Sequence, residues 1–292
     1  MLSSASGATE APALLRAYAC APVWRVIAGV LVAISGASLP VILVMGLLAS
    51  TPVPLAAWVR ALAVFAAAPA LLAGLIHRAV AVEVEVRPGE LVLRRRRLRF
   101  EIPCEAIARI RPWVVPLPGT GFSVWMRSGR RLHCGLHTPE IARLLAALAD
   151  IGNVDAAGAV IEHPSVVYAQ AKRSVGPWRR YHLAIKFVLF ALGPTAIWFN
   201  LTQHIGFGGT LGQYYLEGLG PYLKTFAIHW GLVLVYLILY ASVWRGLTEA
   251  LALSAAWVVP ARAAGVRWAA EIACRLLYYV GVPVIVALPF LQ

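Results

Sequence analysis

The stretch AVEVEVRPGELVLRRRRLRFEIP, residues 81–103, decides the fold of the polar part of this chain. Its beginning alternates small apolar residues with glutamate, and a period of two is typical of a β-strand with one buried face. The RPGE segment, residues 87–90, is typical of a turn. The LVLRRRRLRFEI segment, residues 91–102, then predicts a strand, a charged tip and a returning strand. The chain therefore contains an antiparallel β-region.

The residues that follow extend this region. Residues 102–113 predict another strand, 114–121 a loop rich in proline and glycine, and 121–136 a hairpin that turns at Ser128-Gly129. The segment TPEIARLLAALAD predicts a helix with Thr138 as N-cap and Pro139 at the first helical position. Its apolar residues share one helical face: Ile141, Leu144, Leu145 and Leu148. We expect six or seven short strands closed by one helix over residues 80–152.

This order resembles the bacterial pleckstrin-homology-like domains that occur in membrane proteins. The resemblance is carried by the two hairpins, the closing helix and an "IP-x-x-x-I-x-x-I" pattern made here by Ile102, Pro103, Ile107 and Ile110. It implies a small, bent antiparallel barrel capped by its C-terminal helix. It also implies a module that binds through its surfaces and performs no chemistry. The four-arginine run and the insert Pro112–Gly121 depart from the family pattern.

The composition places this module in a membrane protein. Of 292 residues, 60% are hydrophobic and only 13% charged, whereas soluble domains carry about 25% charged residues. This excludes a plain soluble enzyme, a nucleic-acid-binding tail and a disordered chain. Since a span needs about 20 apolar residues, we expect about five transmembrane helices, the fifth short and marginal. The apolar runs cover Val26–Ala49, Leu55–Ile76, His182–Leu201, Thr225–Trp244 and Leu276–Leu291.

These runs divide the chain into four expected regions. Residues 1–79 form an N-terminal segment, with a mobile start or an interfacial turn over 1–22, and a transmembrane hairpin. The first span is retained, because its apolar run is too long for a cleaved signal peptide. Residues 80–152 form the inserted β-domain, 153–181 a linker with some helix, and 182–292 the C-terminal transmembrane helices. The fold class is thus an α-helical membrane protein with an inserted antiparallel β-barrel.

Charge predicts the orientation of the spans. Lys and Arg total 26 against 13 Asp and Glu, and 17 of the 26 lie in residues 78–180. Basic flanks remain on the cytoplasmic side, so we expect a bacterial inner-membrane protein with its N-terminus and β-domain in the cytoplasm. The C-terminus is then outside, or inside if the fifth run re-enters.

The densest positive patch is the first candidate site: Arg94, Arg95, Arg96, Arg97 and Arg99. Arginine binds phosphate through two parallel hydrogen bonds, and a patch tethered to the inner leaflet can bind anionic headgroups. The alternative is a solvated strand edge whose charges block pairing with another sheet. Alternate residues of a strand point to opposite faces, which favours this alternative.

Other polar residues offer weaker candidates. His204 and His229, near the exported ends of their helices, are candidates for a haem or metal site. Glu249 and Glu271 lie near arginines, and Glu271 with Arg275 has the i, i+4 spacing of a helical ion pair; a proton or substrate path is the alternative. The four cysteines are expected to be reduced. No nucleophile, zinc, P-loop or dinucleotide motif is present.

Taken together, these features favour a non-enzymatic membrane protein, a scaffold, assembly factor or accessory subunit. Its β-domain would bind a protein partner, such as another membrane protein, or anionic lipid. We expect no cofactor, no metal and no nucleic-acid partner. One alternative is a transporter or lipid-handling subunit, since prolines break two apolar runs and acids lie at the edges of others. A haem- or metal-binding membrane enzyme is the other alternative.

Overall fold

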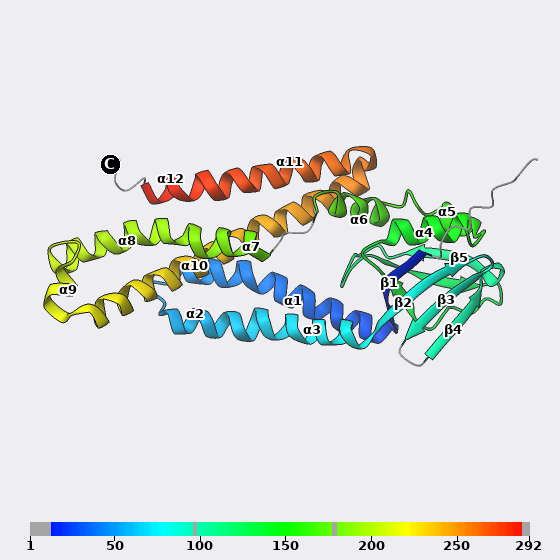
Figure 1. The fold of residues 1–292 in the computed structure, drawn as a ribbon. Coiled ribbons are helices and arrows are strands. Elements are labelled where there is room, and N and C mark those ends of the chain that lie inside the picture. Colours follow the sequence, from blue (N-terminus) through cyan, green and yellow to red (C-terminus); the bar gives the residue numbers. More distant parts are fainter. Residues whose placement is uncertain (1–12, 96–97, 177–179, 288–292) are drawn as a thin grey trace, which may run out of the picture. The chain divides into compact units, whose positions relative to one another are not determined.

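The computed structural model describes residues 13–95, 98–176 and 180–287, in two compact units (Figure 1). The sheet unit comprises the chain up to Val30, Leu72–Ala171 and Ala256–Ala261. The helical unit comprises Leu31–Leu71, Lys172–Ala255 and the chain from Arg262 onward.

The sheet unit is built on seven antiparallel strands in the order β4-β3-β2-β1-β7-β6-β5. Six of them come from the predicted region: β2 (Ala81–Arg87), β3 (Glu90–Arg95), β4 (Leu98–Pro103), β5 (Ile107–Pro112), β6 (Gly121–Met126) and β7 (Gly135–His137). Gly89 and Gly129 have φ of +78° at the predicted turns, a conformation that glycine adopts without a Cβ clash. The sheet is curled, and the predicted antiparallel β-region is confirmed.

The central strand of the sheet is a correction to the sequence analysis. Residues Ala13–Cys20 form β1, which lies between β2 and β7. Ala13 to Tyr18 pair with Val86 to Ala81, and Tyr18 to Cys20 pair with His137 to Gly135. The prediction of a mobile start or interfacial turn is therefore wrong for these residues, while residues 1–12 lie outside the described part of the chain. Consequently, a fragment of residues 80–152 lacks the strand that joins the two halves of the sheet.

One face of the sheet forms the main core. Alternate residues such as Leu15 and Ala17 of β1 and Val82, Val84 and Val86 of β2 are buried. Helix α4 (Ile141–Asp150) packs on them through the predicted face, whose residues Ile141, Leu144, Leu145 and Leu148 have no exposed surface.

The start of α4 differs slightly from the prediction. Its first residue is Ile141, so Pro139 precedes it. Thr138 Oγ1 accepts a hydrogen bond from the Glu140 amide and donates one to the Arg16 carbonyl, 3.0 Å away. The threonine thus ties the segment before the helix to β1.

The predicted linker begins inside this core. Helices α5 (Asp155–Gly158) and α6 (Pro164–Ser174) occupy much of residues 153–181. Val154, Ala157, Val166 and Ala169 belong to the same buried cluster as the sheet. The residues of α5 and α6 up to Ala169 therefore belong to the core of the sheet unit and are not a linker.

Four helices in the described residues are long and apolar enough to cross a membrane. They are α1 (Pro22–Leu47), Leu55–Ala79, Tyr181–Phe207 and α10 (Leu219–Val258). The second consists of α2 (Leu55–Ala61), a π-helical segment (Leu62–Ala67) and α3 (Ala68–Ala79); the third consists of α7 (Arg180–Ala184), a π-helical segment (Ile185–Leu189) and α8 (Phe190–Phe207). Only 11–17% of their most apolar windows is buried, so their surfaces need an apolar surrounding.

The expectation of about five spans is corrected to four within the described residues. The fifth run, Leu276–Leu291, begins at the last residue of α11 (Ala263–Leu276) and continues through a π-helical segment (Leu277–Gly281) and α12 (Val282–Ala287). Residues 288–291 of this run lie outside the described part of the chain, while α11, which precedes it, carries Arg267, Glu271 and Arg275. The segment between the third and fourth candidate spans holds α9 (Gly212–Glu217), which is fixed by a hydrogen bond of 2.9 Å from Gln203 to Gln213.

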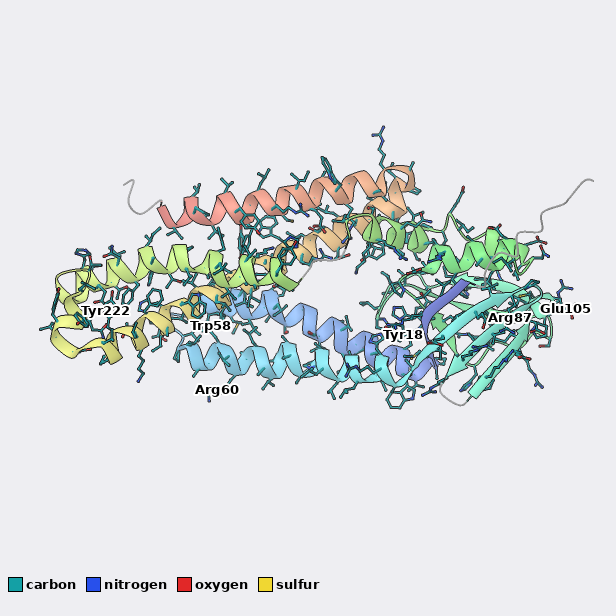
Figure 2. All side chains as sticks on the ribbon, in the orientation of Figure 1. Tyr18, Trp58, Arg60, Arg87, Glu105 and Tyr222 are labelled. Atoms are coloured by element: carbon teal, nitrogen blue, oxygen red, sulfur yellow. The ribbon has the colours of Figure 1, made fainter. Side chains whose placement is uncertain are left out.

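Packing inside the helical unit combines polar and apolar contacts. Ser35 and Ser38 of α1 donate to the carbonyls of Ala66 and Phe65, at 2.8 and 3.0 Å, where the π-helical turn changes the backbone pattern. Trp58 of α2, labelled in Figure 2, is 3% exposed and packs with Val235 and Leu239 of α10. These contacts join the first two spans to the fourth.

The central position of β1 generates a stability prediction. Leu15→Ala removes a side chain that is 3% exposed and leaves a cavity. We expect a loss of about 2–5 kcal/mol from the free energy of unfolding of the sheet unit. Hydrogen exchange of the β2 and β7 amides in the full-length protein measures it. Arg16→Ala on the exposed face of the same strand is the control, and equal exchange in the two variants would contradict the central role of β1.

Candidate lipid-facing groove

The sequence-predicted arginine patch is divided by the structure. Arg94 on β3 and Arg99 on β4 are opposite each other in register, as are Arg95 and Leu98. Arg96 and Arg97 lie outside the described residues.

Two of the described arginines are paired with carboxylates. Arg94 Nη2 lies 3.3 Å from Glu85 Oε2, and Arg99 Nη2 lies 2.6 Å from Glu101 Oε1. Glu85 also accepts from Arg87 Nε at 2.8 Å, and this hydrogen bond holds the pKa of the Glu85 carboxyl below its usual range. The buried Glu85 therefore remains charged at neutral pH. Arg94 and Arg99 of the predicted patch thus belong to ion pairs along strands β2, β3 and β4.

Arg95 has a different role. Its Nη2 donates to the carbonyl of Ala79, 2.6 Å away, at the last residue of α3. The last carbonyls of a helix lack intrahelical donors and carry partial negative charge, so a guanidinium there is favourable. This contact holds the end of α3 beside β3, and both border a groove.

The groove has a volume of about 960 Å³ and lies between the sheet and the adjoining ends of α1 and α3. Its apolar walls include Trp24, Leu75 and Phe100, which are 52%, 59% and 57% exposed. Its polar residues are Arg95, Glu101 and His133. Trp24 is in the first turn of α1 and Leu75 is near the end of α3, which are the ends of two candidate spans. Exposed aromatic residues at the ends of spans are typical of the membrane–water interface.

A second polar feature of the sheet unit is a cluster of aromatic and imidazole rings around Tyr18, which lies on the face of β1 opposite to the core residues Leu15 and Ala17. Tyr18, labelled in Figure 2, stacks on His137 with 5.1 Å between ring centroids, and His77 of α3 lies 5.5 Å from His137. His77 Nδ1 donates to the Ala73 carbonyl at 3.0 Å, since a carbonyl can only accept. Trp113 stacks at 6.4 Å from His137, and Arg25 lies over the Trp113 ring. The cluster joins the start of α1 and the end of α3 to the sheet.

His137 makes this junction sensitive to acid. Burial lowers the pKa of His137 to about 4, and the charge of the neighbouring His77 acts in the same direction. The unfolded chain takes up this proton near pH 6.5. Between these pH values the unfolded state binds more protons, so this contribution to stability is present above pH 6.5 and is lost as the pH falls toward 4.

We therefore expect the melting temperature of the full-length protein to fall as the pH is lowered from about 6.5 to 4. Over this range, His137 should lower the free energy of unfolding by at most about 1.4 kcal/mol per pH unit. His137→Asn removes the titrating group and should flatten this part of the profile. Thermal melts at several pH values measure the effect. His133→Asn at an exposed position is the control, and an unchanged profile in His137→Asn would refute the assignment.

The acids singled out in the sequence form a network in the helical unit. Arg267, which is 1% exposed, donates from both terminal nitrogens to Glu249 at 3.1 Å, and Arg245 lies 2.9 Å from both Glu249 and Glu271. The predicted pairing of both acids is found, but the predicted partner of Glu271 is wrong. Glu271 pairs with Arg245 and Arg267, not with Arg275, because α10 brings a closer guanidinium to it.

This network generates a further stability prediction. Arg267→Met leaves Glu249 and Glu271 without a buried counter-charge, and we expect a loss of about 3–5 kcal/mol. The unfolding midpoint of the purified protein in a neutral detergent measures it. As a control, Arg262→Met removes an exposed arginine from the same region. If Arg267→Met had the same unfolding midpoint as this control, the contacts of Arg267 with Glu249 and Glu271 would not stabilise the protein.

The candidate histidines His204 and His229 each contact a threonine of a neighbouring segment or of their own helix. His204 Nε2 lies 3.1 Å from Thr210 Oγ1, and His229 Nδ1 donates to the Thr225 carbonyl at 2.8 Å. Within the described ranges, no group of three or more His, Cys, Asp and Glu is arranged to hold a metal ion. All four cysteines are free, and burial raises the thiol pKa of Cys20, Cys104 and Cys134. These thiols are therefore poor nucleophiles at neutral pH.

Comparison of the chain with protein-family models, with curated proteins and with solved structures gave no match. The groove thus stands on its geometry alone. Sequence reasoning found Arg95 but missed Trp24, Leu75 and Phe100 as its neighbours. The alternation Leu15, Ala17 and Ala19 against Arg16, Tyr18 and Cys20 is a period-two signal that could have revealed β1, and with it the position of Trp24.

Proposed function

We propose that this chain is a non-enzymatic integral membrane protein whose sheet unit binds anionic phospholipid through the groove. The observation that carries the proposal is the combination of half-exposed Trp24, Leu75 and Phe100 with Arg95 in one concave surface at the ends of two candidate spans. In the cell it would serve as a scaffold, assembly factor or accessory subunit of a bacterial inner-membrane complex. Its N-terminus and sheet unit would face the cytoplasm, as the positive loops favour.

Energetic considerations support lipid as the occupant. Complete burial of one large apolar side chain contributes about 1.5–3 kcal/mol of favourable free energy. Lipid that covers the exposed halves of Trp24, Leu75 and Phe100 would therefore gain a large part of its binding free energy from these three side chains. Each basic residue near an anionic surface adds about 1 kcal/mol. Arg94 and Arg99 are already paired, so the apolar residues and Arg95 are expected to contribute most of the affinity.

The resemblance to pleckstrin-homology-like domains supports the same proposal from the sequence. Such modules act through binding surfaces, and the curled antiparallel sheet with α4 packed on it is compatible with that type of module. A protein partner within the membrane is part of the proposed scaffold role, because most of the surface of the four candidate spans is exposed. One observation favours the alternative of a lipid-handling subunit, namely a charged cavity of about 450 Å³ in the helical unit.

The groove is tested with the full-length protein in nanodiscs of phosphatidylcholine, with and without phosphatidylglycerol. Since β4 is an edge strand, lipid over the groove should protect its outward amides. We expect hydrogen exchange of residues 98–103 to slow by about tenfold when phosphatidylglycerol is present, corresponding to about 1.4 kcal/mol. Phe100→Ser and Arg95→Gln should each reduce this protection.

Arg109→Gln on β5, at the other edge of the sheet, is the control with the same charge change and should keep the protection. Equal exchange in the two lipid mixtures would contradict the proposed preference for anionic lipid. Protection that persists in both groove variants would place the lipid elsewhere on the sheet unit.

A further inference from the structure

The helical unit contains a cavity of about 450 Å³ that the groove does not explain. It is lined by residues of the third candidate span, of α10 and of α11 with the segment that follows it. Tyr278 closes one side, with its hydroxyl donating to the Lys186 carbonyl at 2.9 Å. A cavity of this size is within the range of small-ligand sites.

The charges around the cavity are unbalanced. Lys186, Arg245 and Arg275 line it together with a single acid, Glu271. Glu271 is also held by Arg267 at 3.6 Å, and the other acid of the network, Glu249, is shared by Arg245, Arg267 and Lys172. The described residues of this network and cavity thus comprise five cations and two acids. A bound anion would offset this excess of positive charge.

Trp244 and several apolar side chains also line the cavity. The Trp244 indole N–H is shielded from solvent and has no acceptor among the described residues. The adjacent hydroxyls of Ser242 and Thr248 already donate to the carbonyls of Leu239 and Trp244. The apolar lining includes Leu183, Phe187, Ile238 and Ala241. A buried N–H without an acceptor is costly, so a ligand oxygen at this point would be stabilising.

The polar and apolar parts of the lining define the class of ligand. The Lys186 ammonium lies 4.3 Å from the centroid of the Tyr278 ring, which orients it by a cation–π contact. Guanidinium groups bind the oxygens of a phosphate in pairs. We propose that the cavity binds the phosphate headgroup of an anionic membrane lipid between Lys186 and Arg275, with the Trp244 N–H donating to it, while Arg245 remains paired with Glu249 and Glu271. The first part of the alkyl chain lies along Ile238, Ala241 and Phe187. This site is in the helical unit and is independent of the groove.

The full-length protein in a neutral maltoside detergent tests the proposal with hexyl phosphate as a soluble probe. Hexyl phosphate should raise the melting temperature in a saturable manner. Glycerol phosphate, which lacks the alkyl chain, and hexyl glucoside, which lacks the charge, should each bind about tenfold more weakly or not at all. Phospholipid extracted with the purified protein and quantified by mass spectrometry identifies the natural occupant.

The double variant Lys186→Gln, Arg275→Gln should weaken hexyl phosphate binding by about tenfold or more and should carry less co-purified phospholipid. Arg245 is left intact because it holds Glu249 and Glu271 together. The control Lys224→Gln, Arg262→Gln removes two exposed charges of the same unit away from the cavity lining. Ala241→Trp places a large side chain in the apolar part of the cavity without a change of charge and should also reduce binding. This variant provides a second test if the double variant does not fold.

Two results would overturn the proposal. If hexyl phosphate binds the double variant and Ala241→Trp as tightly as it binds the unmodified chain, the ligand does not occupy this cavity. If glycerol phosphate or hexyl glucoside binds as tightly as hexyl phosphate, the site does not select an anionic amphiphile. Either result leaves the groove assay on residues 98–103 unaffected, because that assay uses other residues.

Discussion

The sheet unit depends on the antiparallel pairing of β1 with β2 on one side and β7 on the other. This strand joins the β2–β4 meander to the β5–β7 part of the sheet, and without it each part would expose unpaired amide and carbonyl groups. Only Ala21 separates β1 from α1, so the same strand also fixes the start of a candidate span. The positions of Trp24 in the groove and of Arg25 over Trp113 follow from that short connection.

The sequence predicted those parts of the fold in which a periodic pattern coincides with a local structure. The valines of β2 and the apolar face of α4 are buried where the pattern requires, whereas Glu85 of β2 is buried against the pattern and is paired with Arg87 and Arg94. The strand β1 was missed because Ala13–Cys20 is rich in small residues and precedes an apolar run, so its alternation resembles the approach to a membrane helix. Four of the five apolar runs correspond to long helices. The fifth is not among the long apolar helices of the described residues, and its last residues, 288–291, lie outside them.

The candidate sites were harder to predict from the sequence, because each combines residues that are far apart along the chain. Spacing within one helix suggested Arg275 as the partner of Glu271, but Arg245 is 26 residues away in sequence and only 2.9 Å away in space. The groove combines side chains from α1, α3 and β4, which no local pattern connects. The arginine run was visible at once, yet its strand register turns Arg94 toward Glu85 and leaves Arg95 for the end of α3.

The groove and the cavity of the helical unit share one physical principle, which applies to an arginine-rich chain with long apolar helices. A cation that already has a carboxylate partner gains little from a phosphate, since the new contact replaces an existing one. A cation beside an uncovered apolar surface gains from a ligand that supplies charge and hydrocarbon together, because both contributions come from the same molecule. Arg95 lies beside the exposed Phe100, and Arg275 lines the same cavity as Phe187 and Ile238, whereas Arg94 and Arg99 are already in contact with carboxylates. Net charge alone would favour any anion, and it is the combination of cations with exposed apolar walls that leads us to propose anionic lipids rather than soluble phosphate or neutral lipids as the ligands.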